Sequence, residues 1–318
     1  MPLHKGHLAL IDFASRQCDQ LFILLCYTKN EVIKGTERET WLQAVATDFS
    51  NVTVVSYLYN EDELPNTSES SREVSLLWSK VIATILPNID IIFSSEMYGG
   101  FLADFLGIEH MCFDRERKNI PIAASTIIEH PLHNWDFIST VAKPYFVKKI
   151  ILLGTESTGK STLAKNLAKH FKTVYVPEMA RKILKKTIDC KPEHLIAIAD
   201  LHAKEIISQT KNANRLLFID TDINITKSYS KYLFKQEIDV ACWIEEANRA
   251  DFYIFLEPDC PFIQDGTRLE DMERNELSLF HKVQLKQAGI SYFSIYGNWE
   301  ERFEKSCIAI THHFKINP

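Results

Sequence analysis

The sequence lacks the features of a membrane, secreted or zinc-binding protein. Its longest apolar run is far shorter than the ~20 residues of a membrane helix, and its first residues, MPLHKGH, do not form a signal peptide. None of the seven cysteines belongs to a C-x-x-C pair or has zinc-site spacing. We therefore expect a cytoplasmic protein without a membrane partner, whose cysteines are buried, reduced thiols.

An excess of basic residues is also absent. The 36 lysines and arginines stand against 42 acidic residues, which gives a net charge of −6. This balance argues against a general nucleic-acid-binding surface, so no DNA partner is expected. A hydrophobic content of 46% and a charged content of 25% are ordinary for a soluble globular protein. The length of 318 residues suffices for two domains and leaves an oligomer open.

Apolar strand-like runs alternate with amphipathic helical stretches in both halves of the chain, which predicts two α/β domains with mainly parallel sheets. Lys143-Pro144-Tyr145 precedes a new apolar run, so the domains are expected to span residues 1–146 and 147–318. Strands are expected at 21–27, 52–57, 90–95, 110–114, 148–154, 173–176, 215–220, 251–257 and 290–296. Helices are expected at 7–17, 71–86, 160–170, 179–186, 193–211, 224–234, 270–287 and 299–313.

Residues 154–161 read G-T-E-S-T-G-K-S, a full match to the phosphate-binding P-loop pattern, between an apolar strand and a helix. Its glycines let backbone N–H groups turn toward phosphate oxygens, and the helix N-terminus adds partial positive charge. Lys160 is expected on the β- and γ-phosphates, and the Ser161 hydroxyl on Mg²⁺. The predicted ATP site comprises Gly154, Ser157, Thr158, Gly159, Lys160, Ser161 and Thr162.

Carboxylates follow two strands of the second half. Asp220 ends the run RLLFID, where a carboxylate would hold magnesium, although a helix cap is the competing interpretation. Asp222 follows two residues later. Glu178 follows the second strand, where small-molecule kinases often carry the carboxylate that binds or deprotonates the acceptor hydroxyl. Arg181 lies one helical turn beyond Glu178, and a surface salt bridge explains this pair equally well.

Two further motifs complete the candidate residues. PFIQDGTR contains Asp265 and Arg268 around a glycine turn; Arg268 would neutralise charge on the transferring phosphoryl group, unless the segment is a simple polar turn. Near the N-terminus, His4-Lys5-Gly6-His7 forms H-x-G-H before a helix. In nucleotidyltransferases both imidazoles of this motif contact a triphosphate, which the glycine admits close to the backbone. Surface histidines are the alternative.

Together these motifs resemble the bacterial family of bifunctional nicotinamide-nucleotide adenylyltransferases and ribosylnicotinamide kinases, the NadR family. The matching segments cover nearly the whole chain in order. They are PLHKGH (2–7), RETWL (38–42), SSEMYG (94–99), FDRERKNIPI (113–122), WDFI (135–138), PYFVKKIILLGTESTGKST (144–162), PEMAR (177–181), FIDTD (218–222) and PDCPFIQDGTR (258–268).

The resemblance implies a Rossmann-like nucleotidyltransferase domain followed by a P-loop kinase domain with a parallel sheet. The kinase would phosphorylate the 5′-hydroxyl of nicotinamide riboside, using ATP and Mg²⁺. Phe262 would stack on the nicotinamide ring, with Asp222, Asp265 and Arg181 also near the substrate. The first domain would join nicotinamide mononucleotide to the AMP part of ATP, with His4 and His7 on the triphosphate and NAD as product or regulator.

The chain departs from the family pattern in three places. No helix-turn-helix segment precedes H-x-G-H, and the family's first apolar strand with its G-x-F turn is absent, so no repressor role is expected. In the family's I-S-x-T-x-x-R segment, Ala123 replaces the serine and Ile128 replaces the arginine. We therefore expect a ribosylnicotinamide kinase with a weak adenylyltransferase domain. The alternatives are a fully bifunctional enzyme with a misplaced start and a nicotinamide-nucleotide sensor without turnover in the first domain.

Overall fold

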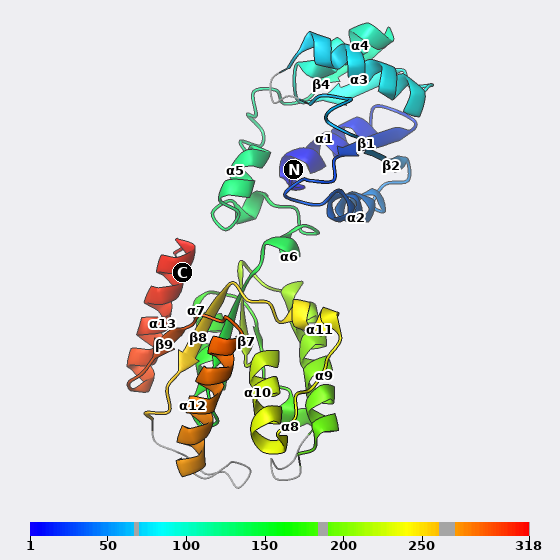
Figure 1. The fold of residues 1–318 in the computed structure, drawn as a ribbon. Helices are drawn as coiled ribbons and strands as arrows, with labels where there is room; N and C mark the ends of the chain where they lie inside the picture. The colour runs from blue at the N-terminus through cyan, green and yellow to red at the C-terminus, as the bar shows by residue number, and fades with distance from the viewer. Residues whose placement is uncertain (67–69, 184–189, 261–270, 318) are drawn as a thin grey trace. The chain divides into compact units, whose positions relative to one another are not determined.

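The computed structural model describes residues 1–66, 70–183, 190–260 and 271–317. The chain divides into two compact units, Met1–Lys143 and Pro144–Pro318. Each unit is an α/β structure in which every pair of neighbouring strands is parallel (Figure 1).

The first unit alternates helices and strands from its beginning. Ser71 shows how the sequence starts one of these helices: its hydroxyl accepts a hydrogen bond from the Val74 N–H, which is otherwise unpaired at a helix N-terminus. The elements are α1 (Lys5–Ser15), β1 (Leu21–Tyr27), α2 (Gly35–Ala46), β2 (Val52–Leu58), α3 (Arg72–Ile85), β3 (Ile91–Ser94), α4 (Tyr98–Leu106), β4 (Glu109–Cys112), α5 (Ala124–Glu129) and η1 (Trp135–Phe137). The short α6 (Lys143–Phe146) follows.

The strands of the first unit form two separate sheets. β1 pairs with β2, and β3 pairs with β4. Within the described residues, β1 and β3 therefore each have one edge that no named strand covers. Backbone groups along such an edge need other partners, which makes a two-stranded sheet a weaker framework than a continuous one.

The second unit contains one five-stranded parallel sheet in the order β6-β7-β5-β8-β9. Its elements are β5 (Lys148–Leu153), α7 (Lys160–His170), β6 (Tyr175–Val176), α8 (Ala180–Ile183), α9 (Pro192–Thr210), β7 (Leu216–Asp220), α10 (Ile223–Phe234), α11 (Cys242–Ala247), β8 (Phe252–Leu256), α12 (Asp271–Gln287), β9 (Phe293–Ile295) and α13 (Trp299–Phe314).

Helices cover both faces of this sheet. Crossovers between parallel strands are right-handed, so α7 lies on the face opposite to α9, α10 and α12. Consistently, α7 packs against α13, while α10 packs against both α9 and α12. Residues Ile150–Leu153 of β5 and Leu217–Ile219 of β7 have no exposed surface. Their continuous apolar runs are what a strand buried on both faces requires.

All nine strands expected from the sequence are present, and their ends differ from the expected ones by at most three residues. Five α-helices were missed: α2, α4, α5, α6 and α11. The cysteines are all free, but Cys112 and Cys242 are exposed and only Cys260 is buried, so the expectation of buried thiols was wrong for these two. Among the described residues, no helix combines the length and apolar character needed to cross a bilayer.

Candidate active site

The loop between β5 and α7 has the backbone conformation of a phosphate cradle. Gly154 has φ +136°, and a Cβ there would lie 2.7 Å from the carbonyl oxygen of Leu256 on the neighbouring strand β8. Gly159 has φ +86°, and a Cβ there would overlap the indole ring of Trp299. Both positions therefore require glycine for conformation and for space. Because β5 lies where the strand order reverses, this loop occupies the usual ligand-binding edge of an open α/β sheet.

Within the loop, Lys160 and Thr158 close a turn on Thr155. The Lys160 ammonium donates to the Thr155 carbonyl at 2.8 Å, and the Thr158 hydroxyl donates to the same oxygen at 2.8 Å. Lys160 is 9% exposed. A phosphate in the cradle offers a stronger, charged acceptor than this carbonyl, so the ammonium can exchange one partner for the other.

The Ser161 hydroxyl donates to Oδ2 of Asp220, which ends β7 and is fully buried. These two oxygen groups come from the start of helix α7 and the end of strand β7, and they meet at the carboxyl edge of the sheet. Oxygen ligands of this kind suit Mg²⁺, which usually keeps one or two protein ligands and takes the rest from phosphates and water. The described residues contain no group of three or more His, Cys, Asp or Glu side chains placed to hold a metal. Ser161 and Asp220 provide two such oxygen ligands, which fit a magnesium ion.

Asp222 has a different structural position from Asp220. It is the N-cap of α10: Oδ1 accepts from the Ile225 N–H at 2.9 Å, and Oδ2 accepts from the Asn224 side chain at 2.6 Å. Burial raises the pKa of Asp222 to about 6, while these hydrogen bonds oppose the shift. The cap considered for Asp220 on sequence grounds is therefore formed by Asp222.

Sequence reasoning missed a buried tyrosine whose pKa responds to the charges of Glu156 and Glu178. The Tyr229 phenol forms a hydrogen bond with the P-loop residue Glu156. Burial raises the pKa of Tyr229 well above its usual value, and the charges of Glu156 and Glu178 add to the shift, which places both carboxylates near the phenol. No short motif marks Tyr229, because its neighbours are far apart in the sequence.

His281 of α12 belongs to the same region. Its ring centroid lies 4.9 Å from that of Tyr229, and its Nδ1 lies 2.7 Å from the Ser228 hydroxyl. Burial, followed by the charge of Lys160, lowers the pKa of His281 to about 3. The imidazole is thus neutral at physiological pH.

Four predicted site residues have side chains that the structure does not describe. Phe262, Asp265 and Arg268 lie outside the described residues, and Arg181 is described only as part of the backbone of α8. Their roles stay predictions.

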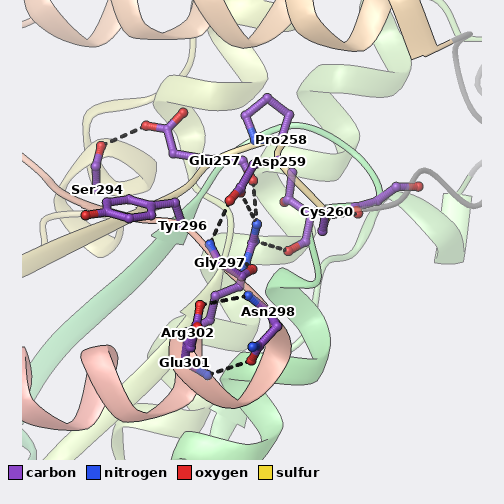
Figure 2. Close-up of polar contacts among 12 residues, drawn as sticks. Glu257, Pro258, Asp259, Cys260, Ser294, Tyr296, Gly297, Asn298, Glu301 and Arg302 are labelled. Carbon is purple, nitrogen blue, oxygen red and sulfur yellow. Dashed lines mark hydrogen bonds and ion pairs between the residues drawn. The ribbon is translucent and has the colours of Figure 1, made fainter.

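The start of α13, which follows the turn after β9, contacts the P-loop. The Asn298 side chain accepts from the Glu300 and Glu301 N–H groups, and the Glu301 side chain accepts from the Asn298 N–H, which starts the helix with a capping box. This helix start carries Trp299, whose indole contacts Gly159, and Arg302, which is 1% exposed. Figure 2 shows Arg302 directed toward Gly297 and Asp259, with Asn298 and Glu301 beside it.

In the first unit, His4 and His7 lie together at the start of α1. Their rings stack with centroids 3.9 Å apart, and the Gly6 N–H donates to His4 Nδ1 at 3.0 Å. A Cβ on Gly6 would lie 2.8 Å from the His4 ring. Burial, the largest cause, lowers the pKa of His4 to about 4 and that of His7 to about 3. Both imidazoles are neutral at physiological pH, so they can donate hydrogen bonds to an anion but bring no full charge to it.

Two arginines lie near these histidines. The charge of Arg117 contributes to the lowered pKa of His4, and the charge of Arg38 to that of His7. Each arginine also has an acidic partner: Arg38 pairs with Glu31, and Arg117 lies 3.6 Å from Glu96.

The two positions that depart from the family pattern both lie at α5. Ala123 is its N-cap and provides no side-chain hydrogen bond, and Ile128 is 39% exposed. A serine at this N-cap would satisfy a helix N–H or donate to an anion, and alanine does neither.

Comparison with known proteins adds relatives of this architecture. Residues 149–302 match the family model described as an AAA domain. The chain is 30% identical to the trifunctional NAD biosynthesis/regulator protein NadR of Salmonella typhimurium, over 84% of this chain and 69% of that protein. It is 29% identical to the NadR protein of Escherichia coli, over 92% of this chain and 76% of that one.

Two solved structures share the fold over the full length. A NadR protein in complex with NAD and AMP-PNP superposes with a TM-score of 0.78 at 19% identity, covering 100% of this chain and 94% of that one. A NadR protein in complex with NR superposes with a TM-score of 0.76 at 18% identity, covering 99% and 94%. At these identities the superpositions establish the fold of both units.

Proposed function

Because this chain belongs to the NadR family, we propose that its second unit is a ribosylnicotinamide kinase that transfers the γ-phosphoryl group of ATP to the 5′-hydroxyl of nicotinamide riboside. The observation that carries the proposal is the contact between Ser161 and the buried Asp220 beside a P-loop of the required geometry. A solved relative at 18% identity is described as a complex with NR, and another as a complex with NAD and AMP-PNP. These ligands support the assignment of substrate class.

In the proposed reaction the acceptor hydroxyl attacks the γ-phosphorus while the bond to the β–γ bridging oxygen breaks and ADP leaves. The P-loop N–H groups and Lys160 hold the phosphates and offset the charge that develops on the leaving oxygen. Ser161 and Asp220 would hold a magnesium ion that arrives with the nucleotide, and this ion would offset negative charge on the phosphates. Glu178 is the proposed acceptor of the hydroxyl proton, and Arg268 is the proposed partner of the transferring group.

For the first unit we propose a weak nicotinamide-nucleotide adenylyltransferase. The stacked neutral pair His4 and His7 supports a triphosphate site, and Ala123 and Ile128 support a low rate because they supply neither hydroxyl nor charge. Full bifunctionality and NAD sensing without turnover are the two alternatives. We propose a cytoplasmic location, consistent with seven free cysteines.

One incubation tests these assignments. The full chain is supplied with Mg-ATP and nicotinamide riboside, and the products are identified. We expect nicotinamide mononucleotide to accumulate with little NAD. NAD as the main product would indicate the bifunctional enzyme. If neither nicotinamide mononucleotide nor NAD forms, the kinase assignment is contradicted.

The lysine of the P-loop provides the matched variant. Lys160→Ala removes the charge that the transition state needs, so turnover should fall by about 10²–10³-fold or more, with the fold intact by circular dichroism. Lys165→Ala, an exposed lysine on the same helix α7, is the control and should retain the wild-type rate. A Lys160→Ala rate within about tenfold of wild type would contradict the P-loop assignment.

A further inference from the structure

A phosphate cradle made of backbone N–H groups needs its carbonyl groups turned the other way. In a trans peptide the C=O of one residue and the N–H of the next point in opposite directions from one rigid plane. Holding the carbonyl of Thr158 on the outside of the loop therefore turns the Gly159 N–H toward the inside. Donors that bond the outward carbonyls therefore hold the N–H groups in their phosphate-binding orientation before the nucleotide binds.

The structure contains such bonds on successive P-loop carbonyls. Arg302 Nη1 donates to the Thr158 carbonyl at 2.9 Å, across 144 positions of sequence. The Cys260 thiol lies 3.2 Å from the Ser157 carbonyl, as a weaker donor. The Thr155 carbonyl is bonded from within the loop by Thr158 and Lys160. Arg302 supplies the charged donor, which makes the stronger bond.

The guanidinium of Arg302 is itself fixed at every nitrogen. Nε donates to the Gly297 carbonyl at 2.7 Å, and Nη2 donates to the Glu257 carbonyl at 2.9 Å and to the Asp259 carboxylate. Asp259 also accepts from the Gly297 N–H at 2.7 Å, so the ion pair lies within a closed network (Figure 2). A buried charge needs such full pairing to be tolerated.

These contacts join three segments to one side chain: the loop after β8, the turn after β9 and the P-loop. Arg302 is almost fully buried, and its guanidinium is planar and rigid. It therefore fixes the orientation of the carbonyl groups that accept its hydrogen bonds. A lysine at this place would keep the charge but could bond fewer of these carbonyls at once.

We propose that Arg302, held by Asp259, is a positioning residue that preorganises the P-loop of the second unit for the triphosphate of its nucleotide. It acts through the Thr158–Gly159 peptide and not by touching the phosphates. The inference rests on the proposed ATP site. It predicts that loss of the guanidinium weakens the binding of any ligand with a triphosphate, whatever base it carries.

The test measures, by calorimetry without acceptor, the equilibrium binding of Mg-ATP and of inorganic triphosphate to the full chain. The binding event that Lys160→Ala abolishes is assigned to the P-loop, which separates it from binding at His4 and His7 of the first unit. Arg302→Met should lose at least about tenfold in affinity for both ligands, by the same factor, and Arg302→Lys an intermediate factor. Asp259→Asn, which keeps Arg302 but removes its counter-charge, should weaken both ligands in the same direction. In turnover, the KM for ATP should rise by the binding factor while the KM for the acceptor stays unchanged.

Lys149→Met is the matched control. Its ammonium donates to the Ala247 carbonyl at 2.8 Å from β5, at the opposite end of that strand from the P-loop. This variant should lower the melting temperature without changing either affinity, which separates general destabilisation from P-loop positioning. If Arg302→Met does not fold, Arg302→Lys and Asp259→Asn decide.

Folded Arg302→Lys and Asp259→Asn proteins that bind both ligands within twofold of wild type would overturn the inference. Variants of Arg302 or Asp259 that lose affinity for ATP but keep their affinity for triphosphate would also overturn the inference, because the effect would then concern the binding of adenosine and not of the phosphates. A wild-type chain that binds neither ligand would overturn the proposed function itself, which distinguishes the two failures.

Discussion

Asp220 and Asp222 show how two buried carboxylates two residues apart serve different purposes. Asp220 ends strand β7 and accepts the Ser161 hydroxyl, whereas Asp222 accepts the Ile225 N–H and starts helix α10. Thr221 between them has φ +68°, which turns the chain from strand to helix within one residue. A charge placed at the first position faces the P-loop, and a charge at the second neutralises a helix N-terminus.

Asp220→Asn should act mainly through magnesium. The amide keeps the shape of the carboxylate but loses its charge, so we expect the magnesium concentration for half-maximal rate to rise about tenfold, with partial recovery of rate at high magnesium. The measurement is the kinase rate across a magnesium titration. Asp200→Asn, on the surface of α9, is the control for loss of a carboxylate. A magnesium curve equal to that of the wild type would mean that Asp220 has no role at the metal.

At the scale of elements, helix α9 supports the site from behind strand β7. His202 of α9 is 4% exposed and forms a hydrogen bond with the backbone of Asp220. Burial lowers its pKa to about 4. The unfolded chain therefore takes up a proton near pH 6.5, before the folded chain does, so the packing of α9 on β7 favours folding at neutral pH and loses this advantage as the pH falls.

This difference predicts a pH dependence of stability. A shift of the His202 pKa from 6.5 in the unfolded chain to about 4 in the folded chain corresponds to about 3 kcal/mol of unfolding free energy. This contribution is fully present above pH 6.5 and is lost as the pH falls toward 4. His202→Gln keeps a side-chain donor for the Asp220 backbone but cannot take up the proton. Its free energy of unfolding, measured by urea denaturation, should fall less between pH 7 and pH 4.5 than that of the wild type. His312→Gln, an exposed histidine of α13, should retain the wild-type slope, and an unchanged slope in His202→Gln would refute the assignment.

At the scale of the whole molecule, the two units differ in how firmly they hold their phosphate-binding motifs. The P-loop follows the central strand of a five-stranded sheet. Its carbonyl groups accept hydrogen bonds from Arg302 of α13 and from Cys260 in the loop after β8. In the first unit, the segment before α1 is held by a bridge between His4 and Ile138 and by a bond from the Ser139 N–H to the Leu3 carbonyl. Its sheet is divided into two pairs of strands.

The first unit should therefore form NAD slowly from nicotinamide mononucleotide and Mg-ATP, well below the kinase rate of the same protein. An arginine at the triphosphate offers a permanent charge and a fork of donors, and its loss typically costs about 1.5–3 kcal/mol. Ile128→Arg and Ala123→Ser should raise NAD formation stepwise, by about tenfold or more together.

The kinase rate of these variants is the internal control and should stay constant, because both substitutions lie in the other unit. An adenylyltransferase rate in the wild type equal to its kinase rate would contradict the weak-activity proposal. No response to either substitution would show that the cause of the low rate lies elsewhere in the first unit.

Local patterns in the sequence determined the strands and the P-loop, because each depends on residues that are neighbours in the sequence. They also marked Ser161 and Asp220 as separate candidate magnesium ligands, whereas the contact between the two, across 59 positions, was decided by the fold. The sequence did not predict helices α2 and α11, because their apolar residues show little helical spacing. Tertiary structure alone decided that Arg302 bonds the Thr158 carbonyl, that Tyr229 meets Glu156, and that Asp222 and not Asp220 is the cap. These contacts join residues distant in sequence or depend on the direction of a side chain, and such relations exist only once the chain has folded.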